Sequence, residues 1–188
     1  MNHIRIFFFG SLFLLTSGII QAQQNQAAAP KMPVDEKSGL ITYSVVIEVK
    51  GQTAAELYRR ALKWAGTFYK NPSDVIRERD STNGKIVCKA RFKIMNPPDK
   101  KGIITDAGNV MYSLRIQFKE GRYRYELSEI NWKQPSYYPC ERWMDRSSPT
   151  FSPAFDHYLL QTDQHATSVL KNLEKAMTSS ETESAGDW

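Results

Sequence analysis

Hydrophobic and polar residues alternate along several stretches of the chain, and each alternation predicts a β-strand with one buried side. Residues 75–79 alternate less regularly, but they precede Asn83-Gly84, a dipeptide typical of a hairpin turn, and are therefore also predicted to form a strand. The predicted strands cover residues 40–50, 75–79, 85–94, 110–119 and 122–127. The pattern therefore predicts five strands of an antiparallel sheet.

Two stretches follow the helical period instead. Thr53 and Glu56 form a capping box, and the helix that they begin runs to about Tyr69, before the helix-ending pair Asn71-Pro72. The second helix is capped by Ser152, and its apolar stripe extends from Phe155 to Met177. Both helices have one apolar side, so we expect them to pack on the apolar face of the sheet.

The predicted order is β-α-β-β-β-β-α, an α+β fold with a five-stranded antiparallel sheet and two helices on one face. Several separated motifs between residues 33 and 132 carry a family resemblance: PVDEKSGLITYS, VVIEVKG, AAELYRRALKWAGTFYKN, GKIVCKARFKI and EGRYRYELSEI. With these motifs the chain resembles an exported bacterial domain family of unknown function with a TATA-box-binding-protein-like (TBP-like) fold. The resemblance implies the TBP-like fold and no catalytic residue. The DNA-binding role of the fold's namesake does not follow from a shared fold.

The amino-terminal residues predict export. Arg5 precedes the apolar run Ile6 to Leu15, and small Ala22 precedes a polar segment, a pattern typical of a secretory signal. We therefore expect a signal peptide at 1–22, a flexible leader at 23–33, one domain at 34–177 and a disordered tail at 178–188. The expected product is periplasmic or extracellular, has no transmembrane segment after cleavage, and has no nucleic-acid partner despite its net charge of +5 before cleavage.

The sequence predicts no catalytic residue, no metal site and no cofactor. His157 and His165 lie eight residues apart on one helix, too far for a shared metal ion, and we interpret both as surface residues. Cys88 takes an inward strand position and is interpreted as a core residue, whereas Cys140 lies in a loop. A disulfide between the two cysteines remains an alternative in an oxidising compartment.

A long aromatic connection at 132–155 is the first candidate binding feature. Tyr137, Tyr138 and Trp143 lie in it, and connections of this length are often binding loops. The alternative, which we favour, is that the rings fix the loop onto the end of the sheet.

The outward face of the sheet is the second candidate. The alternation places nine basic residues there against only Glu48 and Glu126. We expect the following six to form one contiguous basic patch: Lys89, Lys93, Arg115, Lys119, Arg122 and Arg124. The alternative is a plain solvated face, on which lysines discourage edge-to-edge aggregation.

These features favour a non-enzymatic binding or envelope-associated module. Its partner would be an anionic envelope glycan or another envelope protein. The alternative is an envelope hydrolase or isomerase with a pocket at the aromatic loop 132–155. That alternative requires at least two of the following groups to converge in a concavity: His157, His165, Glu126, Glu129 and Cys140.

Overall fold

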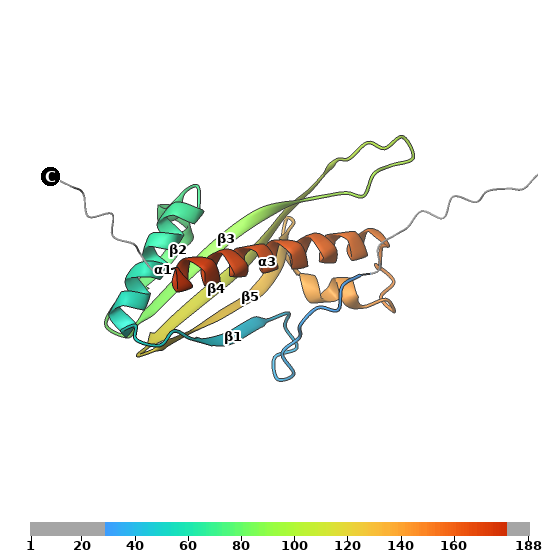
Figure 1. Ribbon diagram of the computed structural model, residues 1–188. Helices are drawn as coiled ribbons and strands as arrows, with labels where there is room; N and C mark the ends of the chain where they lie inside the picture. The colour runs from blue at the N-terminus through green and yellow to red at the C-terminus, as the bar shows by residue number, and fades with distance from the viewer. Residues whose placement is uncertain (1–28, 180–188) are drawn as a thin grey trace, which may run out of the picture.

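Two long helices lie across one face of a twisted antiparallel sheet (Figure 1). The computed structural model describes residues 29–179. The strands are β1 (Tyr43–Glu48), β2 (Ile76–Asp80), β3 (Lys85–Met95), β4 (Asp106–Lys119), β5 (Arg122–Lys133) and β6 (Tyr137–Pro139). The helices are α1 (Ala54–Phe68), the single turn α2 (Pro72–Val75), the 3-10 helix η1 (Cys140–Met144) and α3 (Ala154–Thr178). The predicted signal peptide, the leader up to residue 28 and the tail from residue 180 lie outside the described residues.

The strands are arranged in the order β1-β5-β4-β3-β2, and β6 adds to the free end of β5. Every pairing is antiparallel, which confirms the predicted α+β class. The predicted number of strands and the predicted start of the second strand are wrong. The sheet has six strands, because part of the expected loop pairs with β5 at Tyr137–Pro139. The second strand begins at Ile76, because Pro72 starts a helical turn that includes Val75.

The core lies between the sheet and the two helices. Cys88, Leu114 and Leu127 stand side by side across β3, β4 and β5, and each is almost fully buried. From α1 the core receives Leu57 and Trp64, and the indole N–H of Trp64 donates to Asn172 Oδ1 of α3 at 2.8 Å. The expected inward faces of these strands are therefore confirmed.

The connection between β5 and α3 is held by aromatic packing. Trp143 in η1 is fully buried, and its ring contacts Trp132, Phe155 and Tyr158 with centroid separations of 5.4 to 5.9 Å. This is the arrangement expected if the rings fix the loop onto the sheet.

The hairpin that joins β3 to β4 extends beyond the helices as a projecting arm (Figure 1). We call residues 96–105 of this arm the β3–β4 finger. Its base is attached to α3, because the Gln161 side chain accepts from the Met95 N–H and donates to the Met95 carbonyl, both at 2.9 Å. No helix within residues 29–179 is long and apolar enough to cross a membrane.

Both cysteines are free and buried, so the disulfide alternative is wrong for this structure. Burial raises the pKa of the Cys88 thiol to about 12, which makes it a poor nucleophile. We expect Cys88→Ala to lower the free energy of unfolding by about 1 to 2 kcal/mol through lost packing. Denaturant unfolding measures this cost, and a thiol count on the denatured, unreduced protein should find two thiols. A count of zero in the monomer would contradict the prediction.

Candidate functional site

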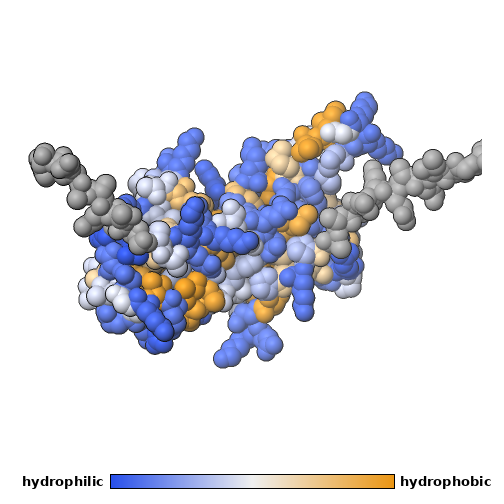
Figure 2. Space-filling model, viewed as in Figure 1, coloured by the Kyte–Doolittle hydropathy of each residue, from blue (hydrophilic) through white to orange (hydrophobic). Residues whose placement is uncertain are grey.

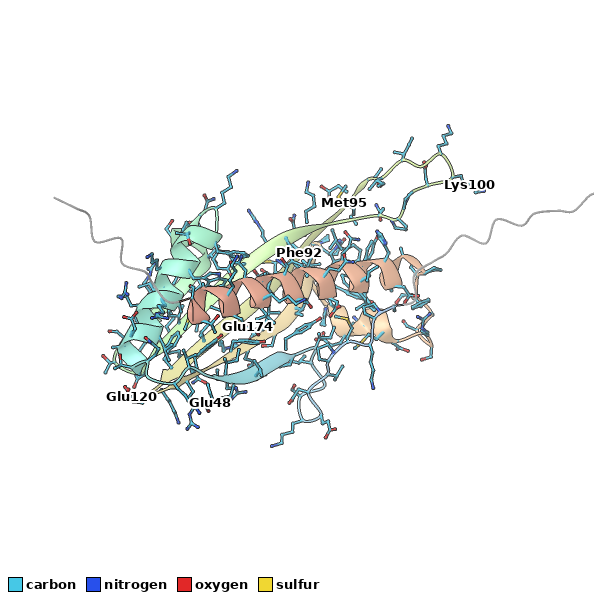
Figure 3. All side chains as sticks on the ribbon, viewed as in Figure 1. Glu48, Phe92, Met95, Lys100, Glu120 and Glu174 are labelled. Atoms are coloured by element: carbon cyan, nitrogen blue, oxygen red, sulfur yellow. The ribbon has the colours of Figure 1, made fainter. Side chains whose placement is uncertain are left out.

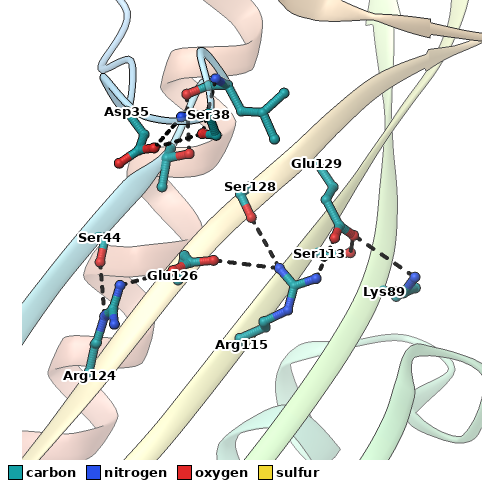
Figure 4. Close-up of polar contacts among 12 residues, drawn as sticks. Asp35, Ser38, Ser44, Lys89, Ser113, Arg115, Arg124, Glu126, Ser128 and Glu129 are labelled. Carbon is teal, nitrogen blue, oxygen red and sulfur yellow. Dashed lines mark hydrogen bonds and ion pairs between the residues drawn. The ribbon is translucent and has the colours of Figure 1, made fainter.

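The face of the sheet opposite the helices carries a network of charged side chains (Figure 4). At its centre Arg115 of β4 forms ion pairs with Glu129, and at 3.6 Å with Glu126. The same Glu126 pairs with Arg124 at 3.0 Å, and Glu129 lies 3.9 Å from the ammonium group of Lys89. Charges of opposite sign therefore alternate across three adjacent strands.

The expected number of acidic residues on this face, only Glu48 and Glu126, is too low. Glu129 belongs to the face, as do Glu78, which pairs with Lys85 at 3.0 Å, and Asp106, which pairs with Lys93 at 2.7 Å. Asp106 and Glu129 were missed because they lie in strand segments to which the predicted alternation did not extend. Glu78 lies within a predicted strand, but the register shift between Ile76 and Glu78 hid which face it takes. Lys119 and Arg122 lie at the far end of the face, beside the β4–β5 turn, and Arg122 is 3.9 Å from Glu48.

A β-bulge in β5 determines where Glu129 points. Met111 pairs with Asn131 and Ser113 with Ser128, so two residues of β5 oppose the single Tyr112 of β4. Glu129 itself has a φ of 54°, a left-handed backbone conformation that is rare for glutamate. Its carboxylate accepts from Ser113 Oγ at 2.6 Å and from Arg115. These two hydrogen bonds, the serine first, lower the pKa of Glu129 below its ordinary value, so the group is anionic at neutral pH.

Glu129 lines a cavity of about 270 Å³, which we call the bulge cavity. Lys89, Asn131 and Tyr137 are among its other lining residues. Tyr137 is 57% exposed, and Lys133 lies over its ring at 4.6 Å from the centroid. The bulge cavity therefore combines an exposed aromatic ring with residues that can donate hydrogen bonds and residues that can accept them.

A second and larger cavity, of about 500 Å³, lies at the edge of the sheet, and we call it the edge cavity. It forms because β2 pairs with β3 only as far as Cys88, whereas β3 continues to Met95 and, among the described residues, no other strand pairs with that edge. The segment that follows α1, including Asn71 and α2, closes the other side of the cavity. Ala90 and Met111 are among its apolar lining residues.

Four basic side chains line the edge cavity: Lys70, Arg77, Lys89 and Arg91. Asp74 is the one carboxylate among the lining residues. Arg77 lies at a second register shift, between Ile76 opposite Cys88 and Glu78 opposite Val87. A bulge changes the direction of the side chain that it carries, so this shift explains how Arg77 reaches the cavity.

Three of these cations have no partner in the described part of the chain. Within residues 29–179, no hydrogen bond or ion pair involves the side chain of Lys70, Arg77 or Arg91. Several cations around one concavity raise the local positive potential, and guanidinium groups bind carboxylate, phosphate or sulfate oxygens in pairs. The edge cavity is therefore suited to an anion.

The two cavities share Lys89 and Met111, so they adjoin on the uncovered face. Of the nine candidates named from the sequence, the cavities use only Lys89 and Tyr137. Lys93, Arg115, Arg122 and Arg124 have carboxylate partners instead. In the aromatic connection, Tyr138 is half-buried against Trp132, and Trp143 belongs to the core.

The groups named for an enzymatic site do not converge. Among the five, only Glu129 lines either of the two adjoining cavities. Cys140 is in the core, and His165 stacks on Phe92 at a centroid distance of 3.9 Å, so the prediction of a surface position for His165 is wrong. Among the described residues, no cluster of three histidine, cysteine or carboxylate side chains could hold a metal ion.

The sequence contained one usable signal for the bulge in β5. Tyr123, Tyr125 and Leu127 follow an odd-numbered alternation, whereas Ile130 and Trp132 are even-numbered and also face the core. A change of phase within one strand indicates an inserted residue. Lys70 and Arg77 gave no such signal, because they reach the edge cavity from outside the regular alternation.

The comparisons with known proteins agree with this fold. A crystal structure of a DUF4468 family protein from Bacteroides ovatus ATCC 8483 superposes with a TM-score of 0.64 at 18% sequence identity, covering 85% of this chain and 98% of that one. A TBP-like protein from Parabacteroides distasonis ATCC 8503 superposes with a TM-score of 0.60 at 17% identity, covering 79% and 99%. At these identities the likeness shows the fold alone.

A search of curated proteins found no match. Residues 43–133 match the family model described as a domain of unknown function (DUF4468) with TBP-like fold. The matched segment contains β1 to β5 and the register shifts at Arg77 and Glu129, as well as most of the lining of the edge cavity and the bulge cavity. Residues 43–133 are therefore a DUF4468 domain with a TBP-like fold.

Proposed function

We propose that the domain is a non-enzymatic binding module that holds an acidic glycan at the edge cavity. One observation carries this proposal: Lys70, Arg77 and Arg91 surround the cavity with no partner among residues 29–179. Elsewhere on the same face most basic side chains are neutralised by a carboxylate. An anion that enters the edge cavity would supply the partner that the chain does not.

The size and lining of the cavity favour a sugar acid over a small inorganic ion. A volume of about 500 Å³ lies within the usual range for small-molecule sites. Besides the cations, the lining includes Tyr69, Val75 and Met111, which offer apolar surface to the C–H groups of a sugar ring. The export expected from residues 1–22 would place the domain among envelope glycans, whose acidic groups are carboxylates, phosphates or sulfates.

A labelled heparin tetrasaccharide provides a defined acidic-glycan probe for fluorescence anisotropy. We expect Arg77→Gln with Arg91→Gln to weaken its binding at least tenfold, because two charge-assisted contacts are lost, each of about 1 kcal/mol or more. The double variant Lys119→Gln with Arg122→Gln removes the same charge from the same face, away from both cavities. This control should bind nearly as tightly as the parent.

Equal weakening in the two double variants would mean that the probe responds to net charge alone, and the proposed site would be wrong. Thermal unfolding of each variant verifies that the fold is kept. All four replaced residues are exposed, so we expect little change in melting temperature.

A further inference from the structure

We propose that the β3–β4 finger is a membrane-docking element that places Ile103 and Ile104 in an anionic lipid surface. The two side chains are 54% and 56% exposed, and they are adjacent in sequence. Single exposed apolar residues are ordinary on soluble proteins, but an exposed pair at the end of a projecting arm marks a contact surface. Apolar residues are visible near the end of this arm in Figure 2.

The finger presents this pair from a fixed backbone. Asp99 N–H donates to the Ile103 carbonyl at 3.0 Å, and the Asp99 carboxylate accepts from the N–H groups of Lys101 and Ile103 at 2.8 and 2.9 Å. Gly102, with a φ of 78°, supplies the left-handed residue that this turn needs. An ordered display lowers the entropy lost on docking.

The base of the finger is equally well held. The Asn96 N–H donates to the Thr105 carbonyl at 2.8 Å, and the Tyr158 hydroxyl of α3 donates to Asn96 Oδ1. Together with the Gln161 contacts to Met95, these bonds connect the arm to the helix layer. Figure 3 shows Met95 near the base of the arm and Lys100 at its tip, away from the sheet and helices.

The charges at the tip favour lipid headgroups of negative charge. Within the described residues, the ammonium groups of Lys100 and Lys101 form no ion pair, whereas the nearby carboxylate of Asp99 is satisfied by backbone N–H groups. Asp106 is paired with Lys93 at 2.7 Å. The tip therefore has two cations without an ion pair beside two apolar side chains. This combination favours binding at the surface of a bilayer, where anionic headgroups attract the cations and acyl chains accept the apolar side chains. Long lysine side chains can extend to the headgroups while the isoleucines enter the bilayer.

The test is sedimentation with phosphatidylcholine vesicles, prepared with and without phosphatidylglycerol. The parent protein should sediment with the anionic vesicles. Ile103→Ser with Ile104→Ser should reduce the bound fraction at least tenfold, and Lys100→Gln with Lys101→Gln should also reduce it. Val46→Ser is the matched control, because Val46 is 54% exposed on β1, outside the finger, and this variant should sediment like the parent.

Two results would overturn the proposal. One is a parent protein that does not sediment with anionic vesicles. The other is unchanged sedimentation of the double serine variant, which would mean that basic residues elsewhere adsorb the protein electrostatically. An Ile104→Trp variant gives an independent reading, because its fluorescence should shift to the blue on adding anionic vesicles, and an unshifted spectrum would contradict insertion.

Discussion

Replacing Trp143 by alanine is expected to lower the free energy of unfolding by about 3 to 5 kcal/mol. Trp143 is completely buried, and three aromatic rings surround it. Alanine would leave a cavity between η1, β5 and α3, because rings fixed by a strand and a helix cannot move far enough to fill it. Urea unfolding followed by circular dichroism measures the change.

Tyr138→Ala in the same connection is the matched comparison. Tyr138 is half-buried, packs edge-on against Trp132 with 6.1 Å between centroids, and lies under the guanidinium group of Arg142. Its loss should cost only about 1 kcal/mol. If Trp143→Ala were no more destabilising than Tyr138→Ala, the connection would not be anchored in the way that the structure indicates.

These aromatic residues show what the sequence could and could not reveal. The length and composition of the 132–155 connection marked it as unusual, and the pinning interpretation is confirmed for Trp143. Yet the same pattern did not separate Tyr137, which is exposed beside the bulge cavity, from Trp143 in the core. Tyr137 is exposed because it lies in β6, and Trp143 is buried because it lies in η1. Neither short element has a periodic pattern in the sequence that would predict it.

The sheet faces were more predictable than the cavities upon them. Inward positions such as Cys88 and Leu114 follow from a period of two, which holds wherever a strand is regular. Both cavities depend instead on irregularities, at Arg77 in β2 and at Glu129 in β5. Charge pairing was likewise hidden, because the partner of Arg115 across the strands is known only once the register is known.

Lowering the pH from about 7 to 4 is expected to destabilise the domain through His165. Burial lowers the pKa of His165 from 6.5 to about 4. Its ring stacks on Phe92, lies edge-on to Tyr112 at 5.6 Å, and has a buried Nε2 without a hydrogen-bond partner among the described residues. A proton on this ring would be charged in apolar surroundings, so the folded protein resists protonation.

The direction of the pH effect follows from the proton balance. Between pH 6.5 and about 4 the unfolded chain binds a proton at His165 that the folded chain does not, so the free energy of unfolding falls as the pH falls. A shift of this size corresponds to about 3 kcal/mol for a fully buried group. His165 is only partly buried, so we expect a loss of about 2 kcal/mol, complete near pH 4.

His165→Phe should remove this contribution, because phenylalanine fills the same space, keeps a ring against Phe92 and does not titrate. Carboxylates titrate in the same range in both proteins, so the quantity to measure is the difference in urea unfolding free energy between parent and variant at each pH. That difference should grow in favour of the variant by about 2 kcal/mol between pH 7 and 4. His157→Gln, which leaves His165 in place, should keep the part of the pH dependence that His165 supplies. A difference that does not change with pH would mean that His165 accepts a proton in the folded state, and the ring would then have to leave its position between Phe92 and Tyr112 or admit water to Nε2.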